Sequence, residues 1–158
     1  MADLTGPTAL EMLAPQVPHM LERARPEIEA PSANGFVLEG HGDLRAEHVC
    51  LLNPPVMFDR VEFDHDFRLI DPHDEIAALG LDCERLGAPL IGPALGTQLD
   101  AAGITAPSDG LSTLYRVLRC LTQARLSIDH LRKPRPRTPE KWAPRALWFM
   151  ATAQKTCA

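Results

Sequence analysis

The sequence predicts a mostly helical α+β fold, in which one small β-hairpin is followed by a bundle of helices. The length of 158 residues fits a single domain over residues 1–158. Apolar residues make up 45% of the chain, which is enough to fill a core and excludes general disorder. Short apolar runs between turn residues occupy residues 36–58, and apolar residues at helical spacing follow from residue 71.

The first of three regions, residues 1–35, is predicted to be helical or irregular. Prolines interrupt residues 1–19, so that only a short helix around Ala9–Leu13 is expected there. A second helix is predicted over Met20–Glu29, and residues 31–35 have the composition of a turn.

The second region, residues 36–70, contains three short strand signals, Phe36–Leu38, Val49–Leu52 and Val56–Phe58. The turn sequence Asn53-Pro54-Pro55 between the last two runs predicts a hairpin. A polar loop that contains glycine separates the first two runs. Asp59 falls where the predicted hairpin ends.

The third region, residues 71–158, is predicted to be a helical subdomain. Asp71 is a good N-cap for a helix with Pro72 at its first position, and Gly87 is expected to end that helix. Three further helices are expected: Pro93–Ala102, a long amphipathic helix from Leu111 to near His130, and a last helix whose start is restricted by Pro144.

The distribution of charge narrows the classes of function. The segment Glu39–Glu84 carries 12 acidic and three basic side chains and so has a net charge of −9, whereas the rest of the chain is at +4. An acidic centre repels nucleic-acid phosphates and can hold divalent cations, so we expect no nucleic-acid partner. No GxxxxGK[ST] sequence occurs, which excludes a P-loop nucleotide site.

The sequence also indicates the compartment. No apolar run approaches the roughly 20 residues of a membrane helix, and the N-terminus has no signal-peptide pattern. The four cysteines form no CxxC pair, so we expect reduced thiols rather than a metal knuckle. A cytoplasmic protein with no membrane partner is therefore predicted.

The chemistry-bearing residues concentrate in His41-Gly42-Asp43 and in Asp59, which follows an apolar residue and a phenylalanine. Phosphoryl transfer needs a carboxylate that accepts the proton of the attacking hydroxyl and ligands for the metal ions on the phosphates. Asp43 on a tight loop can supply the base, and Asp59 can supply a metal ligand. His48, five places after Asp43, can turn back across the loop toward the metal.

The segments HGDLRAEHVCLL and VMFDRVEFDHDFRLIDPHDEIA resemble the aminoglycoside phosphotransferase-like, choline-kinase-like family of the protein-kinase-like superfamily. The resemblance covers roughly residues 20–155 and is tightest over 36–86. It implies the C-terminal lobe of a protein-kinase-like fold that uses ATP and Mg²⁺ (or Mn²⁺). Asp43 would be the catalytic base, His41 a structural member of the catalytic loop, and Asp59 the metal ligand.

Three departures from the family pattern stand out. His48 occupies the position of the family's metal-binding asparagine, where it would contact the cation and the bound nucleotide; imidazole is a poor ligand for Mg²⁺, so His48 can instead lie outside the metal shell or at the surface. Glu75 replaces the aspartate that braces the catalytic loop, and its extra methylene is expected to move the carboxylate by about one ångström or more. Only 40 residues precede His41, so we expect the nucleotide-binding lobe to be absent.

Three functional hypotheses follow. The first is a catalytic lobe that transfers the ATP γ-phosphate to a hydroxyl of a small molecule and that needs a separately encoded amino-terminal lobe or a neighbouring domain for activity. The possible protein partners are that separate lobe or a second copy of the chain, as a homodimer. The second is a truncated or degenerate remnant that acts as a binding module without catalysis. The third is a metal-dependent hydrolase that uses the same carboxylates.

Two further expectations concern the surface. A missing lobe predicts exposed apolar side chains near Phe36, Val37 and Phe58. Two interpretations stay open for a group of acidic and histidine residues, namely a transition-metal site or a solvated acidic loop. The members of this group are Glu62, Asp64, His65, Asp66 and His73.

Overall fold

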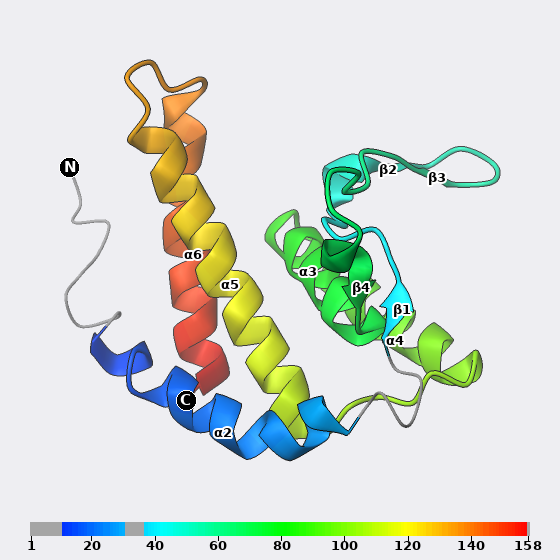
Figure 1. The fold of residues 1–158 in the computed structure, drawn as a ribbon. Coiled ribbons are helices and arrows are strands. Elements are labelled where there is room, and N and C mark those ends of the chain that lie inside the picture. The colour runs from blue at the N-terminus through cyan, green and yellow to red at the C-terminus, as the bar shows by residue number, and fades with distance from the viewer. Residues whose placement is uncertain (1–10, 31–36, 158) are drawn as a thin grey trace. The chain divides into compact units, whose positions relative to one another are not determined.

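A computed structural model describes residues 11–30 and 37–157, and in this part of the chain the predicted mostly helical α+β class is confirmed (Figure 1). The long helices are α2 (Gln16–Glu29), α3 (Pro72–Arg85), α4 (Ile91–Ala101), α5 (Asp109–Leu131) and α6 (Pro139–Cys157). Four two-residue strands are described, namely β1 (Leu38–Glu39), β2 (Val49–Cys50), β3 (Val56–Met57) and β4 (Leu69–Ile70). Two 3₁₀ turns are also described, η2 (Ala46–His48) and η3 (Asp66–Arg68), and residues 11–13 are helical, within the predicted short helix. Helix α2 starts at Gln16, four residues before the predicted start, and so includes Pro18, where the sequence predicts an interruption; proline is tolerated in the first turn of a helix, where its missing amide costs no hydrogen bond.

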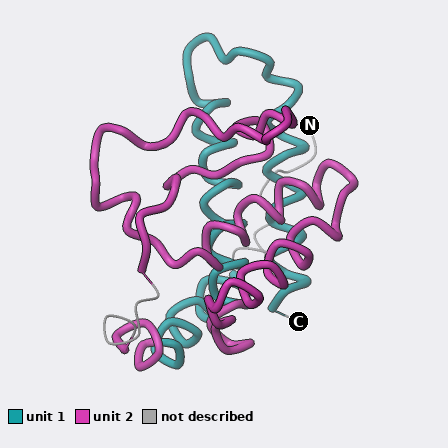
Figure 2. The backbone as a smooth tube through the Cα atoms, turned by 90° about the vertical axis from the view of Figure 1, so that its right-hand side faces the viewer, with its two compact units in different colours: residues 1–24, 113–158 teal, residues 25–112 magenta. Residues whose placement is uncertain are grey.

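The chain divides into two compact units, one of residues 1–24 and 113–158 and the other of residues 25–112 (Figure 2). The first unit is built from two separate stretches of sequence. Residues 71–112, which the sequence groups with the later helices, share a unit with the loop and hairpin region of residues 37–70. The two helices α3 and α4 therefore form the support for that region.

Helix α3 begins where the sequence predicts. The Asp71 side chain caps it by accepting a hydrogen bond from the backbone amide of His73 at 2.8 Å, and Pro72 occupies the first turn. Gly87 follows the last turn with a φ of +92°, a left-handed conformation that glycine adopts without the steric cost of a Cβ.

Helices α3 and α4 pack through two facing glycines. A Cβ added to Gly80 would lie 2.9 Å from the Cα of Gly92, so the two backbones approach each other where neither has a side chain. Helix α4 begins at Ile91, two residues before the predicted start at Pro93, and ends before Gly103, which has a φ of +83°.

The predicted hairpin is confirmed, and a second strand pair accompanies it. Strand β2 pairs antiparallel with β3, with Val49 opposite Met57 and Cys50 opposite Val56. Strand β1 pairs antiparallel with β4, a partner that lies 30 residues further along the chain and that the sequence does not indicate. The predicted turn at residues 31–35, Phe36 and the start of the helix at Ala9 lie outside the described residues.

The other unit contains the antiparallel pair α5 and α6, which Figures 1 and 2 show side by side. Arg116 donates to the Thr156 hydroxyl and Arg145 donates to the Gln123 amide oxygen, and both bonds join the two helices. Apolar side chains from both helices are almost fully buried, and they are Leu114, Val117, Cys120, Ala124, Ala146, Phe149 and Ala153. Helix α6 starts at Pro139, so Pro144 lies inside it rather than at its start. Among the residues that the structure describes, no helix is long and apolar enough to cross a membrane.

Candidate functional site

A single carboxylate of α3 accepts hydrogen bonds from the backbone of the loop between β1 and β2. Glu75 is buried, and its two oxygens accept hydrogen bonds from the backbone amide of His41 at 2.9 and 3.1 Å. The amide of Gly42 donates to the same carboxylate at 2.6 Å. Although Glu75 is longer than the aspartate expected here, it still reaches both amides. Gly40 makes room for it, because a Cβ on Gly40 would lie 2.5 Å from Glu75 Oε2.

The His41 side chain links this loop to the chain segment before Asp59. His41 Nε2 lies 2.7 Å from the carbonyl oxygen of Phe58, and because a carbonyl only accepts, Nε2 carries the proton. The His41 carbonyl in turn accepts from the amide of Val61 at 3.0 Å. His41 Nδ1 is buried and has no hydrogen-bond partner among the described residues. His41 therefore fixes the backbone on both sides of Asp59, before it through the ring and after it through its own carbonyl, which is a structural role.

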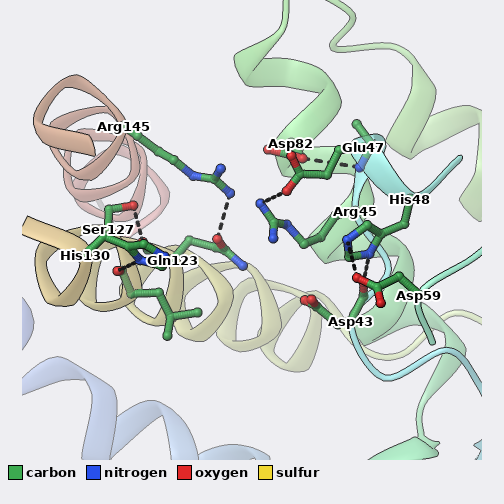
Figure 3. A network of polar contacts seen from close by, with 12 residues as sticks. Asp43, Arg45, Glu47, His48, Asp59, Asp82, Gln123, Ser127, His130 and Arg145 are labelled. Carbon is green, nitrogen blue, oxygen red and sulfur yellow. Dashed lines mark hydrogen bonds and ion pairs between the residues drawn. The ribbon is translucent and has the colours of Figure 1, made fainter. Parts of the chain in front are cut away.

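His48 joins Asp43 and Asp59, as Figure 3 shows. His48 Nδ1 donates to the backbone carbonyl of Asp43 at 2.8 Å, and Nε2 lies 3.4 Å from Asp59 Oδ2. The imidazole stacks on that of His41, with ring centroids 5.6 Å apart, and only 7% of His48 is exposed. His48 is thus buried between the two aspartates, which overturns its placement at the surface.

Asp59 itself has an unusual backbone. Its φ is +62°, in the left-handed region that few residues other than glycine adopt, although aspartate and asparagine tolerate it best. Its side chain is 75% exposed, so the carboxylate faces solvent while one oxygen lies near His48. Backbone strain of this kind is concentrated at functional sites, which supports a functional role for Asp59.

Few side chains of the candidate site could bind a metal ion. Within the described ranges, no three His, Cys, Asp or Glu side chains lie close enough together to hold a metal. Asp59 and the Nε2 atom of His48 form a pair of donors whose atoms are 3.4 Å apart. A magnesium or manganese ion on a nucleotide commonly takes one or two protein ligands and completes its shell with phosphate oxygens and water, so two donors fit such an ion.

Two further residues support the site, and the first of them, Asp82, lies outside the two motif segments. Asp82 is buried in α3, seven residues after Glu75 and therefore on the same helix face, and it accepts from the amide of Ala46 at 3.3 Å. Asp82 also accepts from Arg85 at 2.9 Å. The seven-residue spacing of two carboxylates on one helix is the signal by which Asp82 could be found.

Arg68 supports the other side of the loop. Its guanidinium donates to Glu39 Oε1 at 3.0 and 3.1 Å and to the carbonyl of Val61 at 2.9 Å, and Arg60 donates to the same Glu39 oxygen at 3.0 Å. The hydrogen bond from Arg68, together with the positive charges of Arg60 and Arg68, lowers the pKa of the Glu39 carboxyl below its usual value. Because Glu39 lies in β1 and Arg68 immediately precedes β4, this contact reinforces their pairing.

The surface expectations find support in the described residues. Val37 is 47% exposed and Phe58 is 50% exposed, as predicted, while Phe36 lies outside the described part. Four members of the acidic group, Glu62, Asp64, His65 and Asp66, are exposed on the segment before η3. His73 is set apart from them by its bond to the carbonyl of Ile104 at 3.1 Å.

Comparison with known proteins adds relatives but no activity. The chain is 30% identical over 104 residues to "Uncharacterized protein Mb2027c" of Mycobacterium bovis and to "Uncharacterized protein Rv2004c" of Mycobacterium tuberculosis. The match covers 65% of this chain and 21% of each relative, so the chain spans about a fifth of the length of the relatives that it matches. No family model matches the chain, and no solved structure matches it.

Proposed function

We propose that this chain is the C-terminal, catalytic lobe of an aminoglycoside phosphotransferase-like kinase that phosphorylates a hydroxyl of a small molecule. The observation that carries the proposal is the joining of two distant segments by two histidines. His41 bonds to the carbonyl of Phe58, and His48 contacts both Asp43 and Asp59. The backbone of Asp43, the residue proposed for proton transfer, and the carboxylate of Asp59, proposed for metal binding, are thus both joined to His48.

In this proposal Asp43 accepts the proton of the acceptor hydroxyl. Its backbone is held through the carbonyl bond to His48 and, through the preceding residues, by Glu75. Such holding matters because phosphoryl transfer depends on positioning and electrostatic stabilisation more than on covalent chemistry by the protein.

Asp59 and His48 Nε2 would hold the divalent cation that neutralises the nucleotide phosphates. Because one of the two donors is an imidazole nitrogen, the pair should prefer Mn²⁺ to Mg²⁺, which takes oxygen ligands almost exclusively. No lysine precedes Lys133 and no glycine-rich phosphate loop occurs in this sequence. In this proposal the contacts to ATP come from protein outside these 158 residues, such as an amino-terminal lobe or a neighbouring domain.

The proposal is tested by titrating the full chain with Mn²⁺ and with Mg²⁺ in an isothermal calorimeter, with and without ATP. We expect weak binding of Mn²⁺, weaker binding of Mg²⁺ and poor binding of ATP. Asp59→Asn should remove metal binding, and His48→Asn should shift the preference toward Mg²⁺. Asp64→Asn, an exposed aspartate on the neighbouring segment, is the matched control and should leave binding unchanged.

Two outcomes would contradict the proposal. Metal binding that survives Asp59→Asn would remove the residue on which the site depends. Micromolar ATP binding by the unmodified chain would show that the phosphate contacts are already present. An unchanged preference in His48→Asn would place His48 outside the metal shell and leave Asp59 as the single protein ligand.

A second candidate is a degenerate kinase module that acts by binding rather than by catalysis. The observation that favours it is the contact of His48 with Asp59, because a protonated imidazole there forms an ion pair and occupies the carboxylate oxygen that a cation would need. A chain of this class would bind neither cation at millimolar concentration, and Asp59→Asn would then change its stability and not its ligand binding.

A further inference from the structure

An exposed aromatic pair lies on the segment between β3 and β4. Phe63 is 83% exposed and Phe67 is 63% exposed, and their rings contact each other with centroids 5.9 Å apart at an angle of 58°. The nearby hairpin exposes further apolar side chains, which are Leu51, Leu52, Val56, Met57 and Phe58. An apolar surface of this kind on one unit is typical of a binding face.

The same segment carries a row of uncompensated negative charge. Glu62, Asp64 and Asp66 are exposed and alternate with Phe63, His65 and Phe67, and we call residues 62–67 the acidic aromatic segment. Among the described residues, no lysine or arginine lies within ion-pair distance of these three carboxylates. The neighbouring Arg60 and Arg68 both bind Glu39 instead. The segment therefore presents three negative charges beside two aromatic rings.

A matching positive segment lies in the other unit, in the turn that joins α5 to α6 (orange in Figure 1). Residues 133–138 read Lys-Pro-Arg-Pro-Arg-Thr, and we call them the basic proline turn. Lys133, Arg135 and Arg137 are exposed, and within the described ranges no carboxylate pairs with them.

The basic proline turn is held by a built contact at its base. Trp142 Nε1 donates to the carbonyl of Arg137 at 2.7 Å, and the Trp142 ring stacks on His130 with centroids 4.1 Å apart. The stacking joins the last turn of α5 to the first turn of α6, and the hydrogen bond ties the basic proline turn to α6. The turn is thus presented in a fixed form, which lowers the entropic cost of docking.

We propose that the acidic aromatic segment of one copy of this chain binds the basic proline turn of a second copy. Three carboxylates at alternate positions of one sequence meet three basic side chains at alternate positions of the other, so the charges match in number and in sequence spacing. Prolines dock well on exposed aromatic rings because their conformation is already restricted. Pro134 and Pro136 lie between the basic residues of the turn, and Phe63 and Phe67 lie among the acidic residues of the other segment. The inference does not depend on phosphoryl transfer.

The second copy is the occupant that the charges favour. The central segment of this chain is strongly acidic, and the complementary basic turn is part of the same chain, so two copies can exchange the contact reciprocally. Each copy carries both segments, so in a dimer each acidic aromatic segment can meet the basic proline turn of the other copy.

The experiment is sedimentation velocity of the full chain at about 50 mM salt, where charge attraction is only weakly screened. We expect a reversible dimer whose dissociation constant rises at least tenfold in about 0.5 M salt. Two charge-reversed variants should each be monomeric: the loop variant Glu62→Lys, Asp64→Lys, Asp66→Lys and the turn variant Lys133→Glu, Arg135→Glu, Arg137→Glu.

An equimolar mixture of the two variants should form a heterodimer, because both contacts then pair opposite charges again. Glu11→Lys with Lys155→Glu, two exposed charges outside both segments, is the matched control and should dimerise as the unmodified chain does.

The proposal is overturned by a chain that stays monomeric at about 100 μM in low salt, a concentration at which an interface of this kind should be populated. It is also overturned by a dimer that survives either charge reversal, or by two folded variants that fail to associate when mixed. Phe63→Ser with Phe67→Ser removes the rings without changing charge and should also weaken the dimer at least tenfold. If a charge-reversed variant does not fold, this neutral variant and the salt dependence still decide the question.

Discussion

Replacement of Glu75 is the most direct test of how the candidate loop is held. In Glu75→Ala the amides of His41 and Gly42 lose the carboxylate that accepts both of them. A buried donor left without a partner costs about 1–3 kcal/mol, so two donors predict a loss of about 2–6 kcal/mol in the free energy of unfolding of residues 25–112. Part of that loss is recovered if water enters the vacated space.

Glu75→Gln separates the charge of this side chain from its shape. The amide oxygen of glutamine can still accept at the position of Oε1, which serves both backbone donors, but its NH₂ group would then face the His41 amide that lies 3.1 Å from Oε2. The first turn of α3 also favours a negative charge. We therefore expect an intermediate loss of about 1–2 kcal/mol in Glu75→Gln.

Hydrogen exchange measured by mass spectrometry is the suitable assay, because both tryptophans lie in α6 and fluorescence would report on the other unit. Peptides that contain residues 40–44 should exchange fastest in Glu75→Ala and at an intermediate rate in Glu75→Gln. Glu62→Ala, which removes an exposed carboxylate, should change unfolding by no more than about 0.5 kcal/mol. Exchange in Glu75→Ala that matches the unmodified chain would refute the assignment of Glu75 as the support of this loop.

Three further predictions concern packing, pH and thiol chemistry. Gly80→Ala should lower the denaturation midpoint, because its Cβ would lie 2.9 Å from the Cα of Gly92, and thermal denaturation followed by circular dichroism would detect this. The folded-state pKa of Glu39 is lowered by Arg68, so the stability that this carboxylate contributes is present above the unfolded pKa near 4.5 and is lost as the pH falls through the folded value. Glu39→Gln should therefore flatten the fall in melting temperature between neutral and acid pH. Cys50 is exposed and should react first with a thiol reagent, ahead of the three buried or half-buried thiols, and cleavage with peptide mapping would identify the labelled site.

The elements that the sequence predicts well are those whose signals are local. The cap at Asp71 lies next to the proline and the amide that it serves, and the stop at Gly87 needs only the conformational freedom of that residue. The hairpin is signalled by the turn between its strands. In each case the residues that decide the structure lie within about one helical turn or one hairpin of each other.

The pairing of β1 with β4 is a part of the fold that local sequence signals do not indicate. Each strand has two residues, too few for an alternating pattern, and the paired residues lie 30 and 32 positions apart. The contacts that hold them are the Arg68 bonds to Glu39 and Val61 and the bond from the Gly40 amide to the Arg68 carbonyl at 2.8 Å. An arginine in an acidic segment gives no sign of which carboxylate it will bind, so this part of the fold could not be predicted.

The proximity of the candidate site residues was predictable, and their bonding was not. The spacing of His41, Asp43, His48 and Asp59 singles out these four residues, because a loop followed by a hairpin returns the chain to its starting point. The spacing does not show which partner each imidazole nitrogen of His41 and His48 contacts. His48 is placed between two aspartates by the direction of its ring, and that direction is fixed by the stacking on His41 and by the bond to the Asp43 carbonyl.

The bonding of His48 also limits what the site can be. Its Nδ1 must carry a proton in order to donate to the Asp43 carbonyl, so Nε2 is the atom that remains to face Asp59 at 3.4 Å. A bare lone pair facing a carboxylate oxygen is repulsive, and the contact becomes attractive only when a proton or a metal ion lies between the two atoms. A cation there makes His48 and Asp59 a ligand pair, whereas a proton makes them an ion pair with no place for metal. The two proposed functions therefore differ in whether a metal ion or a proton lies between His48 Nε2 and Asp59 Oδ2. The metal titrations of His48→Asn and Asp59→Asn distinguish these two cases.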